Sequence, residues 1–295
     1  MFLGREESRH ATRALRLKPG SVVEVCDGRG AVMTGELVEW PAGASEAVGV
    51  APIGEVARAP FAGPRWEVAV ACGGLKGGRA DWLVEKCAEL GASALLPLLT
   101  ERSANVGSSA AGKKGKAGKK RDKSRGRNGK GNGEGEGEDG GGWGWMSDGA
   151  DGDKRGREGR WERVAMAASK QCLRTHALRI MQPIPFDALV ERVATAPVAL
   201  LAAAGAPPLQ EVLQQHGAGE SPSTGDKTED TYFSGGGILI VGPEGDFTDQ
   251  EVAALVSAGA KPVGLGPLRL RVETAAVGIM ACISIMHPHR NPPGC

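Results

Sequence analysis

The sequence predicts an α/β protein in which a parallel sheet covered by helices follows a small β-rich segment. From Arg65 onward, apolar runs such as Trp66–Ala71 and Ile238–Val241 lack polar alternation, and helical stretches separate them. Such runs are typical of strands buried on both faces, as in a parallel sheet with helices on either side. Before Arg65 the pattern differs, because apolar and polar residues alternate from Ser21 to Cys26 as in a half-buried strand.

The N-terminal segment is predicted to contain a hairpin and one further strand. Ser21–Cys26 and Ala31–Trp40 alternate in polarity, and Asp27–Gly30 between them has the composition of a turn. A short strand is predicted at Ala47–Ala51. Gly and Pro punctuate Pro41–Pro64, which indicates that a small domain ends there.

After residue 65, buried strands alternate with helices. The strands are predicted at Trp66–Ala71, Ala94–Leu99, Pro197–Ala202, Ile238–Val241 and Pro262–Leu265. The helices are predicted at Arg79–Leu90, Trp161–Leu173, Leu209–Gln215, Thr248–Ala258 and Glu273–Met286. Thr248 and Glu251 have the spacing of a capping box at a helix start. Gly91 and Gly259 stand where glycine commonly ends a helix.

Residues 104–159 form a low-complexity insert. Its 56 positions hold 18 Gly, 13 Lys or Arg and 9 Asp or Glu, so we expect it to be disordered because it buries too little apolar surface to offset its chain entropy. The chain has 36 basic and 35 acidic residues, of which 23 and 26 lie outside the insert. The foldable part is therefore slightly acidic, and its bulk charge does not indicate nucleic acid binding. The basic half, Lys113–Lys130, either contacts RNA or forms a solvated tether.

Membrane and metal partners are not expected. Met1–Gly20 has no apolar core of signal-peptide length, and the longest nearly apolar stretches, Val193–Ala206 and Ala275–Met286, are shorter than the ~20 residues that span a bilayer. We therefore expect an intracellular, soluble protein. The six Cys form no C-x-x-C pair and have no His at zinc-ligand spacing, so no metal site is expected.

Three loops that contain Gly follow predicted strands and can be compared with known ligand-binding loops. Cys72–Arg79 lacks both the Lys-Ser/Thr pair of a P-loop and the G-x-G-x-x-G register, which disfavours a nucleotide-binding α/β enzyme. Gly242–Phe247 and Leu265–Ala275 follow successive predicted strands, and open α/β sheets hold ligands at the carboxyl ends of their strands. Ordinary tight turns have the same glycines, so spacing alone leaves both interpretations open.

Seven segments form a specific combination when they are taken in order. They are His10–Gly20, Asp27–Gly30, Lys76–Gly91, Thr100–Ser103, Arg160-Trp161 with Gln171–Arg174, Gly242–Gly245 and Leu270–Ala275. In this register they resemble the 16S rRNA (uracil-N3) methyltransferases, the RsmE family of the SPOUT superfamily. The resemblance covers most of the chain outside the insert.

This resemblance implies a PUA-like RNA-binding β-barrel at residues 1–60 and a trefoil-knotted SPOUT methyltransferase domain at residues 61–290, interrupted by the insert at 104–159. It implies S-adenosylmethionine as the cofactor, a homodimer, and methylation of N3 of a specific uridine in small-subunit ribosomal RNA, free or in the assembled small subunit. The implied catalytic residues are Arg102, Arg174, Arg271 and Glu273. The implied cofactor-binding residues are Thr100, Gly242, Pro243, Glu244, Gly245, Leu265, Gly266 and Leu270. The implied RNA-binding residues are Arg13, Arg16 and Lys18.

The chain departs from the family pattern at several points. Asp246 stands where a second Gly is usual, and Val272 replaces a usual Thr and so removes a hydroxyl. The first barrel strand of the family is expected to be missing. The alternative function is therefore a catalytically impaired SPOUT-fold protein that binds RNA or the ribosome, and for Glu273 the alternative role is that of an ion-pair partner at a helix start. The Gly/Lys-rich insert favours a chloroplast or another organelle in a eukaryote, and the cytoplasm is expected in a bacterium.

Overall fold

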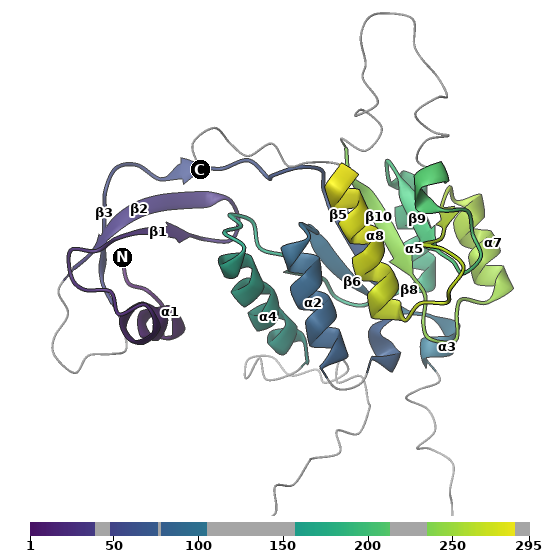
Figure 1. Ribbon diagram of the computed structural model, residues 1–295, viewed down its shortest axis with the longest axis horizontal. Helices are drawn as coiled ribbons and strands as arrows, with labels where there is room; N and C mark the ends of the chain where they lie inside the picture. The colour runs from purple at the N-terminus through teal and green to yellow at the C-terminus, as the bar shows by residue number, and fades with distance from the viewer. Residues whose placement is uncertain (39–47, 76–77, 105–156, 213–234, 287–295) are drawn as a thin grey trace, which may run out of the picture.

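The computed structural model of this 295-residue chain describes residues 1–38, 48–75, 78–104, 157–212 and 235–286. They form a four-stranded sheet near the N-terminus and a seven-stranded sheet after it, which lie side by side in Figure 1. Most of the insert predicted at 104–159 lies outside the described residues. Within the described part of the chain, no helix has the length and apolar character needed to cross a membrane.

The smaller sheet is antiparallel and is built on the predicted hairpin. Its strands are β1 (Val22–Cys26), β2 (Ala31–Leu37), β3 (Val50–Pro52) and β4 (Ala57–Arg58), and β2 pairs with each of the others. The side chain of Asp27 fixes the predicted turn, because its Oδ1 accepts hydrogen bonds from the backbone N of Arg29 at 2.7 Å and of Ala31 at 3.0 Å. Met33 and Leu37 of β2 are buried on the inner face, as the alternation predicted.

A helix that the sequence analysis missed precedes this sheet. Helix α1 (Arg5–Arg9) continues directly into a π-helical turn, η1 (His10–Ala14). The buried hydroxyl of Ser8 accepts a hydrogen bond from the backbone N of Val48 at 2.9 Å and thereby fastens α1 beside the sheet. The segment has almost no large apolar residue, so it shows no helical stripe that a pattern search would detect.

The larger sheet is parallel throughout, which confirms the predicted α/β architecture. Its strand order is β11-β9-β10-β5-β6-β7, and β8 also pairs with β6. The strands are β5 (Trp66–Val70), β6 (Ala94–Leu99), β7 (Arg179–Ile180), β8 (Ile184–Pro185), β9 (Ala199–Ala202), β10 (Gly237–Val241) and β11 (Lys261–Val263). Every residue of β10 is buried, because this strand lies between two others and under helices on both faces.

Helices cover both faces of this sheet. Helices α2 (Arg79–Glu89), α4 (Arg157–Gln171) and α8 (Val272–Met286) pack on one face, where Figure 1 shows them in a row. Helices α5 (Phe186–Thr195) and α7 (Asp249–Ser257) pack on the other face through the buried Leu189 and Leu255. Two short helical segments, η2 (Cys72–Gly74) and α3 (Glu101–Ala104), follow β5 and β6.

The helix ends follow the predicted capping chemistry. Thr248 Oγ1 accepts from the backbone N of Glu251 at 3.2 Å, and the Glu251 carboxylate accepts from the backbone N of Thr248 at 2.8 Å. Gly91 and Gly259 follow α2 and α7 with φ of 86° and 107°, a region that glycine adopts without strain. The sequence analysis missed helix α5, although Leu189 and Val193 have the i, i+4 spacing of one buried helix face.

The two sheets meet at the turn between β1 and β2. The backbone N of Gly30 donates to Thr175 O at 3.0 Å, and a Cβ on Gly30 would lie 2.6 Å from the His176 ring. His176 in turn packs edge-on against Phe61, with 5.3 Å between ring centroids, and burial is the main cause that lowers its pKa. Glycine at position 30 therefore permits the close approach of the two sheets.

Replacing Leu239 by Ala should reduce the free energy of unfolding by about 2–5 kcal/mol, because the change removes buried apolar contacts and leaves a cavity at this fully buried position of β10. The control Leu173→Ala, at a side chain that is 90% exposed, should change it by less than about 0.5 kcal/mol. Urea denaturation followed by circular dichroism measures both. Similar losses in the two variants would contradict a core centred on β10.

Candidate functional site

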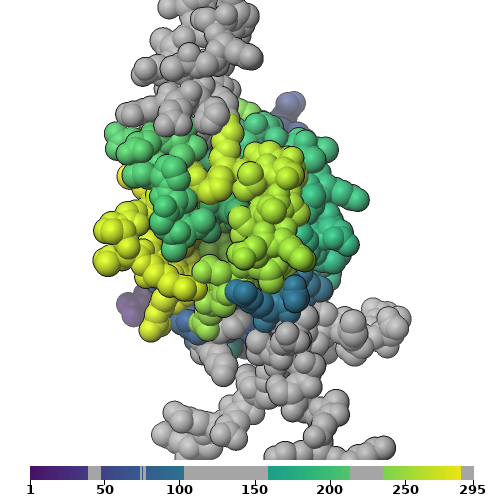
Figure 2. Space-filling model, turned by 90° about the vertical axis from the view of Figure 1, so that its right-hand side faces the viewer, coloured from purple at the N-terminus to yellow at the C-terminus, as the bar shows by residue number. Residues whose placement is uncertain are grey.

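The described residues form a cavity at the carboxyl ends of β9, β10 and β11. It has a volume of about 710 Å³, and the last residues of the three strands, Ala202, Val241 and Val263, line it. Figure 2 looks onto this part of the molecule, where the surface is hollowed between green and yellow segments. The predicted loops Gly242–Phe247 and Leu265–Ala275 both contribute to the lining, so the ligand site predicted at this edge of the sheet has a cavity to occupy.

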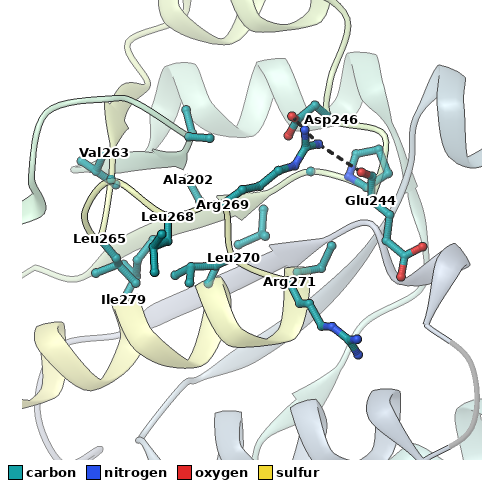
Figure 3. Close-up of a pocket in the computed structure, with 18 of the residues that line it drawn as sticks. Ala202, Glu244, Asp246, Val263, Leu265, Leu268, Arg269, Leu270, Arg271 and Ile279 are labelled. Carbon is teal, nitrogen blue, oxygen red and sulfur yellow. Dashed lines mark hydrogen bonds and ion pairs between the residues drawn. The ribbon is translucent and has the colours of Figure 1, made fainter.

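One end of the cavity is apolar and the other is charged. Figure 3 shows Val263, Leu265 and Ile279 together at one end, and Glu244 and Asp246 at the other. This division suits a ligand that combines an apolar ring with a charged tail.

The loop after β10 is shaped by two local constraints. A Cβ on Gly242 would lie 2.9 Å from the Phe247 ring, so glycine lets the end of the strand approach that buried ring. Asp246 has φ of 60°, a left-handed conformation that few residues other than glycine adopt. The buried carboxylate of Glu251, in the first turn of α7 after this loop, connects α7 to α3, because its Oε1 accepts from the backbone N of Glu101 at 3.2 Å.

Two arginines from α2 and α3 hold this loop. Arg102 of α3 donates to the backbone O of Gly245 and, at 3.3 Å, to that of Asp246. Arg79 begins α2 and donates to the Glu244 carboxylate at 3.0 Å. That hydrogen bond is the largest cause that raises the pKa of Arg79, so its guanidinium stays charged.

A third arginine holds the loop from the cavity. Arg269, from the loop after β11, donates to Asp246 Oδ2 at 2.8 Å and to the backbone O of Glu244 at 3.2 Å. The two loops that line the cavity are therefore joined to each other across it, as the dashed lines of Figure 3 show.

Glu273 is buried at the start of α8, next to Arg79. Its Oε1 lies 3.5 Å from the Arg79 guanidinium, and its Oε2 has no hydrogen-bond partner among the described residues. The ion pair connects the first turns of α2 and α8, and Glu273 does not itself line the cavity.

Most residues predicted to bind the cofactor line the cavity. They are Gly242, Pro243, Glu244, Leu265, Gly266 and Leu270. Gly245 and Thr100 do not line it. A Cβ on Gly245 would lie 3.5 Å from Cδ of Arg102, and Thr100 is buried at the end of β6.

Three of the predicted catalytic residues lie at or next to the cavity. Arg271 lines it, while Arg102 and Glu273 contact residues at its rim. The sequence analysis did not assign Arg79 and Arg269, although both line the cavity. A signal existed for each: Arg79 lies in one of the resembling segments, and Arg269 lies two residues before Arg271 in a predicted ligand loop.

Arg174, the fourth predicted catalytic residue, is not brought to the cavity. Its guanidinium donates to the backbone O of Ala88 at 2.5 Å and of Ala92 at 3.0 Å, which lie at the opposite end of α2 from Arg79. Burial is the main cause that lowers its pKa. In the described chain Arg174 satisfies carbonyl groups at a helix C-terminus, which lack intrahelical partners.

The residues predicted to bind RNA lie on another part of the molecule. Arg13, Arg16 and Lys18 are exposed on and after η1. This segment follows α1, which Figure 1 places at the other end of the molecule from α7. The structure therefore separates these cations from the cavity.

Comparisons with known proteins match both parts of the chain. A family model described as an RNA methyltransferase domain matches residues 63–121 and 147–284, and a model described as an RNA methyltransferase PUA domain matches residues 3–39. The chain is 25% identical over 275 residues to a protein of Synechocystis named ribosomal RNA small subunit methyltransferase E, a match that covers 93% of this chain and 69% of that protein. A Bacillus subtilis protein of the same name is 25% identical over 280 residues, with coverage of 95% and 87%.

Solved structures share the fold. A ribosomal RNA small subunit methyltransferase E from Neisseria gonorrhoeae, bound to S-adenosyl methionine, matches with a TM-score of 0.61 and 20% identity, over 97% of this chain and 91% of that chain. A putative methyltransferase from Legionella pneumophila, in complex with the same cofactor, matches with a TM-score of 0.61 and 21% identity, over 97% and 91% of the two chains.

Proposed function

The chain belongs to the RNA methyltransferase family, and from this premise we propose that it methylates N3 of one uridine in small-subunit ribosomal RNA. The coarser activity is S-adenosylmethionine-dependent methylation of ribosomal RNA. The observation that carries the proposal is the cavity at the ends of β9, β10 and β11, because both loops that line it belong to the segment that the family model matches.

The cavity fits S-adenosylmethionine in its chemistry. The apolar side chains of Val263, Leu265 and Ile279 suit the adenine ring, and Gly266 leaves backbone groups accessible because it has no side chain. The charged end at Glu244 and Asp246 suits the amino acid part of the ligand. When bound, the cofactor supplies a methyl group on a positively charged sulfur.

Arg271 is the proposed catalytic cation. N3 of uracil must lose its proton before or while it attacks the methyl group, and negative charge then develops on the uracil oxygens. Arg271 lines the cavity and, within the described residues, forms no ion pair. Its guanidinium is therefore available to stabilise that charge.

Arg102 and Glu273 are proposed to position other groups. Arg102 holds the backbone of the loop after β10, and Glu273 holds Arg79 from a buried position outside the cavity lining. These contacts support the ion-pair role for Glu273 over a role as general base. For Arg174, its hydrogen bonds at the end of α2 support a structural role instead of the catalytic one.

The proposal extends to assembly. A PUA-like domain at residues 1–60 would present Arg13, Arg16 and Lys18 to RNA, and the family resemblance supports a trefoil knot within residues 61–290.

A homodimer is supported by two neighbouring helices with exposed apolar side chains, Trp82 of α2 and Ile285 of α8. The relatives named above are bacterial and lend no support to the organelle predicted from the insert.

One observation favours the alternative of an RNA-binding protein with impaired catalysis. Val272 is buried and lines the cavity, at the position where the sequence analysis noted a usual Thr. Valine has no hydroxyl, so position 272 cannot form the hydrogen bond to cofactor or substrate that a Thr side chain could form. Binding of S-adenosylhomocysteine without methyl transfer to any RNA substrate is the result that this alternative predicts.

Gly266→Ala should weaken binding of S-adenosylhomocysteine about 5- to 150-fold, because φ of 123° forces an alanine to strain or to rearrange the loop at a cost of roughly 1–3 kcal/mol. Gly54→Ala is the matched control, since Gly54 has φ of 89° and, like Gly266, no atom within 4 Å of an added Cβ, but lies in the smaller domain. Isothermal titration calorimetry measures both affinities. An unchanged affinity in Gly266→Ala would contradict the assignment of this loop to the cofactor.

Small ribosomal subunits that lack the modification should accept a labelled methyl group from S-adenosylmethionine faster than naked ribosomal RNA of the same sequence. The reason is that the foldable part is slightly acidic and needs a shaped surface more than bulk charge attraction. Mass spectrometry of nuclease fragments should map the methyl group to N3 of a single uridine. A methyl group on ribose or on another base would overturn the proposed reaction and leave the methyltransferase family intact.

Arg271→Ala should lower kcat by about 100-fold or more, as expected when a donor that stabilises developing charge is removed. The affinity for S-adenosylhomocysteine should change much less, because the proposed target of Arg271 is uracil. Arg179→Ala, at an exposed arginine of β7, is the control for loss of one positive charge and should retain full activity. Equal kcat values for Arg271→Ala and the unmodified protein would exclude this role.

A further inference from the structure

Asp246 and Arg269 face each other from different loops of the cavity. Asp246 follows β10 and Arg269 follows β11, and the Asp246 carboxylate accepts from the Arg269 guanidinium at 2.8 Å. The same guanidinium reaches the backbone O of Glu244 at 3.2 Å. Figure 3 shows the Arg269 side chain extending along the cavity toward Asp246. Both residues line the cavity, so a ligand there lies beside this bridge.

The backbone at Asp246 is in the left-handed region. Its φ is 60°, which glycine adopts freely and which Asp adopts more readily than most other residues but only where its surroundings favour it. Strained residues of this kind persist where neighbouring groups hold them, and they cluster at ligand clamps. Arg269 is the neighbour that contacts the carboxylate, and Arg102 contacts the carbonyl of the same residue.

The strength of the bridge suits reversible closure. The side chains of Arg269 and Asp246 are 63% and 56% exposed, and exposed ion pairs of this kind contribute about 0.2–1 kcal/mol. That is too little to hold the fold and enough to change how often the two loops separate. Arg79 differs, because it also lines the cavity but is held by the buried carboxylate of Glu273 as well as by the exposed carboxylate of Glu244.

We propose that Asp246 and Arg269 form an ionic latch that joins the two loops over the bound S-adenosyl ligand and slows its release. They are positioning residues for methyl transfer and take no part in the transfer itself. The latch rests on the proposed function, because that function identifies the ligand as an S-adenosyl compound. The latch lengthens the time for which this ligand stays bound.

The test uses the full chain and measures the dissociation rate of S-adenosylhomocysteine by stopped-flow displacement. Asp246→Asn and Arg269→Gln should each release the ligand about 1.4- to fivefold faster, the factor that an exposed ion pair of this strength gives. The double variant should release it no faster than either single variant, because the two side chains act as one unit. Added salt should speed release from the unmodified protein more than from any of these variants. Asp249→Asn removes a nearby exposed carboxylate from α7 and should leave the rate unchanged.

Two further variants separate a latch from a structural role. Asp246→Gly should speed release while thermal stability is retained or raised, because glycine relieves the backbone strain. Arg269→Lys should restore part of the slow release, because it keeps the positive charge. A lower melting temperature with unchanged release in Asp246→Gly would overturn the latch.

Other outcomes are equally decisive. Additive effects in the double variant would overturn the latch. Faster release in Asp246→Asn with an unchanged rate in Arg269→Gln would also overturn it, by showing that the carboxylate contacts the ligand directly. If the unmodified protein binds the ligand and every variant releases it at the same rate, the latch fails and the proposed function stands. If the unmodified protein binds no S-adenosylhomocysteine, both fail together.

Discussion

Strand β10 forms hydrogen bonds to β9 on one side and to β5 on the other, and it is buried along its whole length. Its backbone has no access to water, so every donor and acceptor must find a partner in the neighbouring strands. Its side chains must also be covered on both faces: Leu239 belongs to the core cluster that includes residues of α2 and α8, and Ile240 belongs to the cluster that includes residues of α5 and α7. The two helical layers are therefore a consequence of burying this strand.

The cavity begins where this hydrogen-bonded ladder ends. Beyond Val241 the chain turns away, and its carbonyl groups lose the partners that a sheet provides. Arginines supply some of those partners, since Arg102 and Arg269 together bond to three carbonyl groups in the loop after β10. The arginines near the site therefore have two uses. Arg102 and Arg269 donate hydrogen bonds to backbone carbonyl groups, whereas the proposed role of Arg271 requires a guanidinium that is not used in this way.

Local patterns in the sequence predicted the parts of the fold that local physics determines. Unbroken apolar runs predicted the parallel strands, and the spacing of Thr248 and Glu251 predicted a capped helix. The contacts that shape the site are different, because they join distant residues: Arg79 and Glu244 are 165 positions apart, and no periodicity relates them. The family resemblance placed Arg174 among the catalytic candidates, but its hydrogen bonds at the end of α2 hold it away from the cavity.

The separation of the proposed RNA-binding residues from the cavity has a consequence for how the proposed uridine would be selected. If Arg13 and its neighbours hold RNA, the distance from η1 to the cavity determines which nucleotide reaches the methyl donor. That distance is fixed only if the two sheets keep their relative orientation. The contact at Gly30 favours a fixed orientation. Its backbone N donates to the backbone O of Thr175, and it packs closely against the His176 ring, so the contact does not depend on a long, flexible side chain. Selection by a fixed span needs a folded substrate, and an assembled small subunit presents its uridines at fixed distances where a flexible strand does not.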